Sequence, residues 1–201
     1  MKVLAFATFD DYATYCRKLN HLEKLNATGF APSEPGTLCG YDKFADDGSF
    51  VRTILHEGCH LFYQQAFPGS RPPSWVAEGM ATNFEGFTLT DGHPTFTFIS
   101  RERSGEAREA VRRHALPSIS EFLKADAGEL IATDPKRALT FYGEAWAVFY
   151  FMNHTLDRRY RDGFAAFMER TNQGGKADLK EALGPAFDTL EADFAEFVQG
   201  M

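Results

Sequence analysis

The sequence predicts a single α+β domain over its 201 residues. Short β-prone runs dominate before residue 50, at 2–8, 29–31 and 37–41, with turn-forming residues between them. From residue 50 onwards, apolar side chains recur at three- and four-residue spacing, the period of a helix with one buried face. We therefore expect an N-terminal strand and helix part (1–49), a pair of functional helices (50–88) and a mainly helical remainder (89–201).

The composition is that of an ordinary soluble domain. The chain is 44% hydrophobic and 24% charged, with 21 basic and 28 acidic residues and a formal net charge of −7. Its densest basic stretch, residues 101–113, is interleaved with glutamates, which indicates a solvated helix face. We therefore expect neither nucleic acid nor an anionic membrane as a partner.

The cysteines and the apolar runs indicate the compartment. Cys16, Cys39 and Cys59 do not make a complete set of disulfide pairs and fit no zinc-knuckle spacing, so we expect reduced thiols. No apolar run reaches the length of a membrane span, and the run at 3–9 is too short for a signal peptide. We therefore expect a cytoplasmic protein by default. If the chain is a domain trimmed from a longer protein, its localisation stays open.

Residues 50–67 form a predicted helix that contains the HExxH pattern, with histidines at 56 and 60. Two histidines four residues apart lie on the same face of a helix, so both imidazoles can reach one ion. The predicted buried stripe of this helix lies on another side and comprises Val51, Ile54, Leu55, Gly58, Leu61 and Phe62.

This pattern is typical of zinc metallopeptidases. The glutamate between the two histidines, Glu57, can take a proton from a water molecule that zinc activates. Catalytic zinc usually keeps three protein ligands, and two histidines with one glutamate are a known set. We therefore expect one Zn²⁺ ion as cofactor and a third ligand downstream of His60.

A second predicted helix, residues 75–84, supplies that ligand. Ser74 is a favourable N-cap and two prolines precede it, so Glu78 lies in the first turns of the helix. The intervening Pro/Gly-rich turn lets this helix fold back along the first one. A carboxylate near a helix N-terminus also serves as a helix-dipole partner. Together with the histidine pair, however, Glu78 is the predicted third ligand.

The two motifs together resemble those of the gluzincin zinc metallopeptidases. HExxH followed by W-x-x-E-G-x-A-x-x-x-E, from Trp75 to Glu85, is similar to the aminopeptidase N and leukotriene A4 hydrolase group and to small uncharacterised bacterial gluzincin domains. The resemblance implies a thermolysin-like fold with Glu78 as the third zinc ligand. It also implies an acidic residue that supports a ligand. Glu85 matches one such position, but the thermolysin-like pattern uses the place of Thr82, so Thr82, Asn83 and Glu85 all stay candidates.

The resemblance implies two further parts of a peptide-cleaving site. In the aminopeptidase group, a tyrosine before a similar helix donates a hydrogen bond to the tetrahedral oxyanion. Tyr142, in the apolar stretch 138–156, is the candidate here, although alignment on Ala145 would put Phe141 in its place. An edge strand ahead of the zinc helix binds extended peptide in gluzincins, a role implied for residues 37–41, with a purely structural strand as the alternative.

We therefore predict a zinc metallopeptidase that acts on peptide or protein substrates. Its site comprises the metal ligands His56, His60 and Glu78 and the catalytic residues Glu57 and Tyr142. Two alternatives stay open, a zinc hydrolase of a non-peptide substrate and a zinc-binding pseudo-peptidase with a binding or regulatory role. The Gly-x-Met-Glu-Asn stretch that holds the substrate amine in the aminopeptidase group is absent ahead of the zinc helix, which favours the pseudo-peptidase and argues against an aminopeptidase. The sequence does not determine the oligomeric state.

Overall fold

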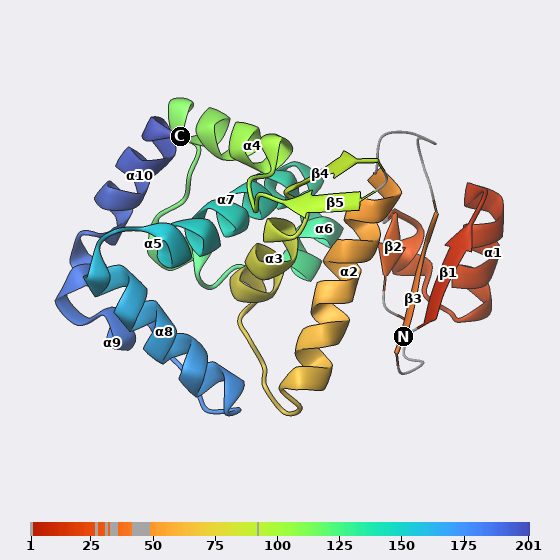
Figure 1. Cartoon of the computed structure of the whole chain (residues 1–201), viewed down its shortest axis with the longest axis horizontal. Helices are drawn as coiled ribbons and strands as arrows, with labels where there is room; N and C mark the ends of the chain where they lie inside the picture. Colours follow the sequence, from red (N-terminus) through yellow and green to blue (C-terminus); the bar gives the residue numbers. More distant parts are fainter. Residues whose placement is uncertain (1, 27, 31, 33–35, 42–48, 92) are drawn as a thin grey trace.

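The fold is α+β in a computed structural model that describes residues 2–26, 28–30, 32, 36–41, 49–91 and 93–201. A small sheet with one covering helix forms the N-terminal end, and helices make up most of the remainder (Figure 1). Helix α2 (Ser49–Ala66) stands between these two parts and contacts both of them. Residues on α2 can therefore meet side chains from either part.

The N-terminal sheet has the strand order β1-β3-β2. β1 (Lys2–Phe6) runs parallel to β3 (Thr37–Tyr41), and β2 (Gly29–Phe30) pairs antiparallel with β3. All three strands match predicted ones, although residue 31 lies outside the described ranges. The prediction that 37–41 is a peptide-binding edge strand is wrong, because β3 pairs with β1 along its whole length and with β2 at Cys39 and Gly40. The composition of a strand shows that it pairs, but not whether it lies at an edge.

Helix α1 (Phe9–Lys18) covers this sheet. It begins where the Thr8 hydroxyl accepts a hydrogen bond from the Asp11 backbone N–H, and a 3₁₀ turn (Leu22–Asn26) follows it. The apolar spacing of residues 12–25 predicts one continuous helix, but α1 ends at Lys18, so that prediction is wrong at its C-terminal end. The four buried residues at this interface form a small core of their own, which comprises Tyr12, Cys16, Phe30 and Cys39.

Helices α2 and α3 (Ser74–Asn83) match the predicted pair to within one residue at each end. The chain reverses between them at Gly69, whose φ of +94° favours glycine. Phe62 was predicted to be buried but is 68% exposed, because α2 buries Cys59 and Tyr63 instead. The hydrophobic period alone did not distinguish these two faces.

The start of α3 also differs from the prediction. Pro73 occupies the N-cap position, and no side chain caps the helix there. The Ser74 hydroxyl instead accepts a hydrogen bond from the backbone N–H of Ala127, 2.9 Å away, at the start of α6 (Ala127–Thr133). Ser74 therefore links two helices rather than capping one.

The remainder of the chain is a short hairpin followed by helices packed around α7 (Pro135–His154). α7 begins at its N-cap Asp134 and contributes deeply buried side chains to the main core, among them Phe141 and Trp146. Among the described residues, no helix is both long and apolar enough to cross a lipid bilayer, and Cys16, Cys39 and Cys59 are buried. The other elements of this part are β4 (Phe87–Thr90), β5 (His93–Phe96), α4 (Arg101–Arg112), α5 (Ile119–Phe122), α8 (Arg158–Asn172), α9 (Leu179–Leu183), a 3₁₀ turn (Gly184–Asp188) and α10 (Leu190–Gly200).

Gly79 lets α3 lie directly against α7. A Cβ atom at position 79 would lie 2.5 Å from the carbonyl oxygen of Ala145 and 2.8 Å from Cβ of Phe149. Both distances are below normal van der Waals contact, so a side chain there would force the two helices apart. Because Gly79 follows Glu78 directly, this contact also fixes the position of Glu78.

We predict that Gly79→Ala lowers the free energy of unfolding by about 1–3 kcal/mol, because the added methyl group overpacks the α3–α7 contact. Urea denaturation followed by circular dichroism measures the change. Gly105→Ala on α4 is the matched control, since a Cβ there meets nothing within 4 Å. It should leave stability unchanged or raise it by up to about 1 kcal/mol, as expected for glycine in a helix interior. Equal stability of the two variants would contradict the close-packing argument.

Candidate metal centre

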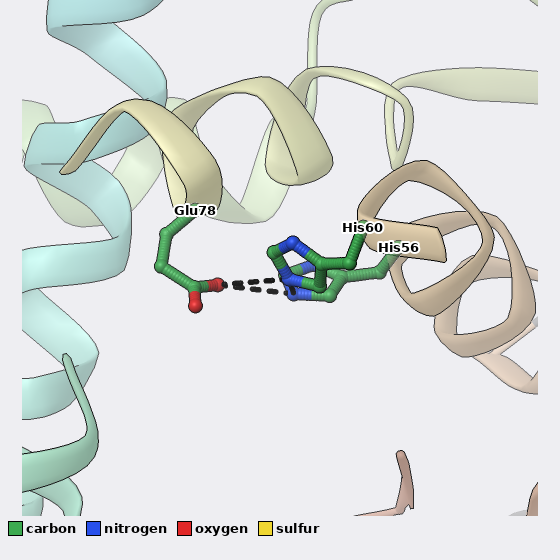
Figure 2. Close-up of side chains that lie close together, drawn as sticks. All are labelled: His56, His60 and Glu78. Atoms are coloured by element: carbon green, nitrogen blue, oxygen red, sulfur yellow. Dashed lines mark hydrogen bonds and ion pairs between the residues drawn. The ribbon is translucent and has the colours of Figure 1, made fainter. Parts of the chain in front are cut away.

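Three side chains from α2 and α3 converge on one point (Figure 2). The Nε2 atoms of His56 and His60 lie 3.2 Å apart. Oε2 of Glu78 lies 3.1 Å from Nε2 of His56 and 3.5 Å from Nε2 of His60. Among the described residues, this is the group of histidine, cysteine and acidic side chains whose ligand atoms are close enough to share a metal ion. The side chains are 13–20% exposed, so the site is sheltered yet within reach of solvent.

The geometry of α2 positions the two histidines of this cluster, and the packing of α3 positions the glutamate. His56 and His60 are one turn apart on α2, so their rings project from the same face. Glu78 comes from α3, whose position against α7 depends on Gly79. The Thr82 hydroxyl donates a hydrogen bond to the backbone carbonyl of Glu78, 2.7 Å away, and so ties the turn that carries the carboxylate.

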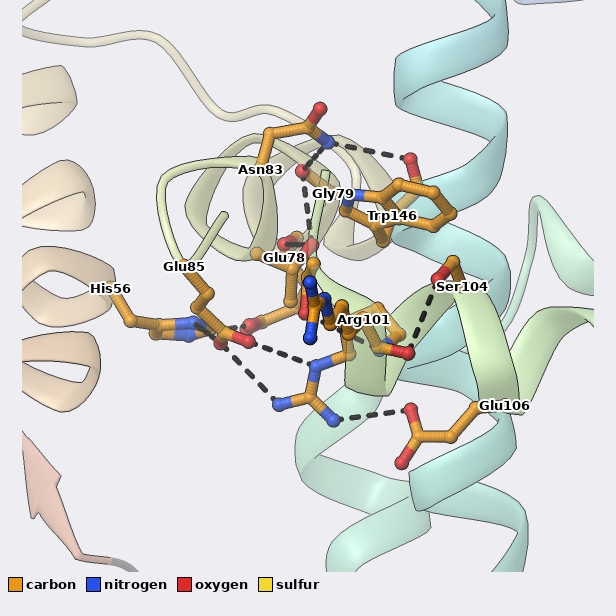
Figure 3. A network of polar contacts seen from close by, with 12 residues as sticks. His56, Glu78, Gly79, Asn83, Glu85, Arg101, Ser104, Glu106 and Trp146 are labelled. Carbon is orange, nitrogen blue, oxygen red and sulfur yellow. Dashed lines mark hydrogen bonds and ion pairs between the residues drawn. The ribbon is translucent and has the colours of Figure 1, made fainter. Parts of the chain in front are cut away.

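Glu85 is the residue of the three remaining candidates that contacts a histidine. Its Oε1 atom accepts a hydrogen bond from Nδ1 of His56 at 2.8 Å. Thr82 bonds to backbone carbonyls of its own helix, and the Asn83 amide donates to the carbonyls of Gly79 and Trp146 (Figure 3). A histidine that donates Nδ1–H to a carboxylate has its ring orientation and tautomer fixed, which leaves Nε2 facing the other two ligand atoms.

An arginine that the sequence did not indicate holds Glu85 in place. Arg103 on α4 donates from Nε to Oε2 of Glu85 at 3.0 Å and from Nη2 to Oε1 at 3.4 Å. Its third nitrogen, Nη1, donates to Oε2 of Glu106 at 3.2 Å. Arg103 lies within 101–113, the stretch predicted to be a solvated face, yet its side chain is only 15% exposed. Charged residues at helical spacing give the same sequence pattern whether they face solvent or a neighbouring helix. The sequence therefore gave no indication of this contact.

Burial and hydrogen bonds together set the charges in the cluster. Burial alone would raise the pKa of Glu78, but hydrogen bonds with His56 and His60 outweigh it and lower that pKa. Glu85 behaves likewise, since its contacts with His56 and Arg103 outweigh burial and lower its pKa. Burial opposes charge on His56, yet hydrogen bonds to Glu78 and Glu85 raise its pKa to about 10. Two ionised carboxylates therefore flank one imidazole, an arrangement that attracts a cation.

Glu57 and Tyr142 lie beside this cluster, and their polar groups have no hydrogen-bond partner among the residues that the structure describes. None of the described residues hydrogen-bonds to the Glu57 carboxylate, and burial raises its pKa against the opposing effect of the two histidines. The Tyr142 ring lies 6.1 Å from the His56 ring, measured between centroids, and its hydroxyl has no partner in the described part of the chain. Burial, and then the negative charges of Glu78 and Glu57, raise the pKa of Tyr142, so its hydroxyl keeps its proton.

The structure also separates Tyr142 from the alternative that the alignment left open. Phe141 has no exposed surface and packs in the main core, with its ring 5.4 Å from that of Phe122. The two residues thus point to different sides of α7. Tyr142 lies on the side that faces the candidate metal centre.

Comparison with known proteins gives a family and no function. Residues 50–175 match the family described as "Protein of unknown function (DUF1570)", a segment that contains every residue of the site described above. Neither the search of curated proteins nor that of solved structures gave a match. Because the matched segment covers more than half of the 201 residues, the chain belongs to the DUF1570 family.

Proposed function

We propose that this protein is a zinc-dependent peptidase with a thermolysin-like arrangement of its catalytic helices, in which His56, His60 and Glu78 hold one zinc ion. The observation that carries the proposal is the spacing of the three ligand atoms, at 3.1, 3.2 and 3.5 Å. Zinc bonds of roughly 2.0–2.1 Å in a tetrahedron place neighbouring ligand atoms about 3.3 Å apart. The three separations agree with that value.

The chemistry of the donor set supports zinc over other common ions. Two imidazole nitrogens and one carboxylate oxygen form a set typical of catalytic zinc, whereas Mg²⁺ and Ca²⁺ prefer oxygen ligands alone. Three protein ligands leave the fourth position of a tetrahedral ion for water or substrate. What zinc supplies in such a set is Lewis acidity, which lowers the pKa of water towards neutrality and polarises a carbonyl group.

The free groups beside the cluster take the remaining roles. Glu57 accepts a proton from the attacking water and transfers it to the leaving amine, a task that requires a carboxylate without a fixed partner. The protonated Tyr142 hydroxyl donates a hydrogen bond to the oxyanion that develops on the substrate carbonyl. A domain that only bound zinc would have no need for these two unpaired groups next to its ligands, so they favour a catalyst over a pseudo-peptidase.

We predict that Glu78→Ala removes bound zinc, because two histidines alone bind it far more weakly than three ligands. The measurement is the zinc content of the purified, dialysed protein by elemental analysis. Glu109→Ala is the control, since Glu109 is an exposed residue of α4 whose partners are Arg112 and Arg113. Equal zinc content in the wild type and Glu78→Ala would remove Glu78 from the ligand set.

We predict that Glu57→Gln retains zinc but lowers the rate of peptide hydrolysis by about 10²–10⁴-fold, the usual contribution of a general base. A quenched fluorescent peptide library, incubated with and without a chelator, gives the rates. Full activity of Glu57→Gln would refute the role of Glu57. A wild-type protein that holds zinc and cleaves no peptide would instead support the pseudo-peptidase or a non-peptide substrate.

We predict that zinc binding releases about one proton at pH 7, because Nε2 of His56 must lose its proton to bind zinc and the pKa of His56 is raised to about 10. Protons compete with zinc below that pKa, so the apparent affinity should rise about tenfold between pH 7 and pH 8. Titration calorimetry in buffers with different ionisation enthalpies measures the number of protons released. An affinity that does not change with pH would contradict the predicted charge state of His56.

A further inference from the structure

Arg103 occupies a junction between several parts of the candidate centre. Its guanidinium makes two hydrogen bonds to Glu85 and one to Glu106, and its Cζ atom lies 5.4 Å from the centroid of the Tyr142 ring. Glu85 in turn accepts the Nδ1 hydrogen bond of His56. Figure 3 shows the row of polar contacts that leads from His56 through Glu85 towards Glu106. One side chain thus touches both the carboxylate behind a candidate metal ligand and the candidate oxyanion donor.

The contacts use properties that arginine has and lysine lacks. The guanidinium is planar, keeps its charge when buried and can donate to both oxygens of one carboxylate while a third nitrogen serves another acceptor. Glu85 is only 8% exposed, so its charge requires a partner that remains ionised. The same cation can also interact with the face of an aromatic ring, and its Cζ atom lies over the Tyr142 ring.

Close packing of α4 on α7 fixes the position of the Arg103 backbone. A Cβ atom at Gly143 would lie 2.8 Å from Cβ of Glu106 and 3.3 Å from the backbone carbonyl oxygen of Arg103. Glycine at 143 therefore allows the two helix backbones to approach right beside Tyr142. The Arg103 side chain has little freedom to leave this interface, so it can transmit the position of α4 to Glu85.

We propose that Arg103 is a positioning residue that holds the Glu85 carboxylate against Nδ1 of His56 and supports the Tyr142 ring from the same point. The polar partners of Arg103 among the described residues are Glu85 and Glu106, and neither His60 nor Glu78 is one of them. Its effect on His56 therefore passes through Glu85. With Arg103 in place, Glu85 has one orientation, and the His56 ring presents Nε2 to the point shared with His60 and Glu78. The inference rests on the proposed zinc site.

The test is a double-mutant cycle on zinc release, with the whole chain loaded with zinc. Excess 4-(2-pyridylazo)resorcinol captures released zinc, and its absorbance gives the dissociation rate. Partners behind a metal ligand typically alter metal affinity 10–100-fold, so Arg103→Met and Glu85→Gln should each speed release by about tenfold or more. Because Arg103 acts through Glu85, the double variant should release zinc no faster than the faster single variant. Arg103→Lys keeps the charge without the two-pronged contact and should fall between the wild type and Arg103→Met.

Arg101→Met is the matched control, because Arg101 is an exposed arginine on the same helix. It should release zinc at the wild-type rate. Urea denaturation of each metal-free variant separates positioning from stability, since a purely structural Arg103 would lower stability and leave the release rate unchanged. Wild-type release from a folded Arg103→Met protein would overturn the inference, and so would effects that multiply fully in the double variant. A wild-type chain that binds no zinc would overturn both the proposed function and this inference. A wild-type chain that binds zinc, together with an unchanged release rate in Arg103→Met, would overturn the inference alone.

Discussion

The contact between Gly79 and the backbone of Ala145 is the constraint on which the candidate centre depends. It lets α3 pack against α7 more closely than any side chain at position 79 would allow, and it fixes the direction in which the preceding residue, Glu78, points. Helix α2 lies on the other side of α3, so a shift of α3 would separate the Glu78 carboxylate from both histidines. Ligand separations of 3.1 and 3.5 Å leave little room for such a shift. The geometry of the site is therefore a property of core packing.

Charges in the centre alternate in sign along a row that starts at Glu78 and passes through His56, Glu85 and Arg103 to Glu106. Each of these side chains is largely withdrawn from water, which disfavours an isolated charge. Pairing offsets that cost, and the removal of Arg103 would leave Glu106 without an ion-pair partner in this row and Glu85 with His56 alone. Buried ion pairs add little net stability, since the cost of desolvation offsets much of their attraction. The proposed zinc site, with three ligand atoms about 3 Å apart, would require such an arrangement.

The segment that matches the family contains the candidate centre and excludes the N-terminal sheet. Residues 50–175 begin one residue into α2 and run through α3, α4 and α7, and every side chain of the candidate centre lies within this segment. The N-terminal sheet and its small core lie outside that segment, and β3 is paired on both sides. The resemblance to gluzincins assigned peptide binding to this strand, and its central position removes that assignment. The proposed roles of His56, His60, Glu78, Glu57 and Tyr142 do not depend on it.

The sequence by itself determined what local geometry controls. The period of a helix puts His56 and His60 on one face of α2, and the motif around Glu78 predicted a second helix at nearly its observed bounds. Only the tertiary structure decided which of Thr82, Asn83 and Glu85 reaches His56, and that Arg103 stands behind it. It also gave Tyr142, rather than Phe141, the place beside the site. The reason is physical, since spacing along one helix follows from its backbone, whereas contacts between helices depend on how closely they pack.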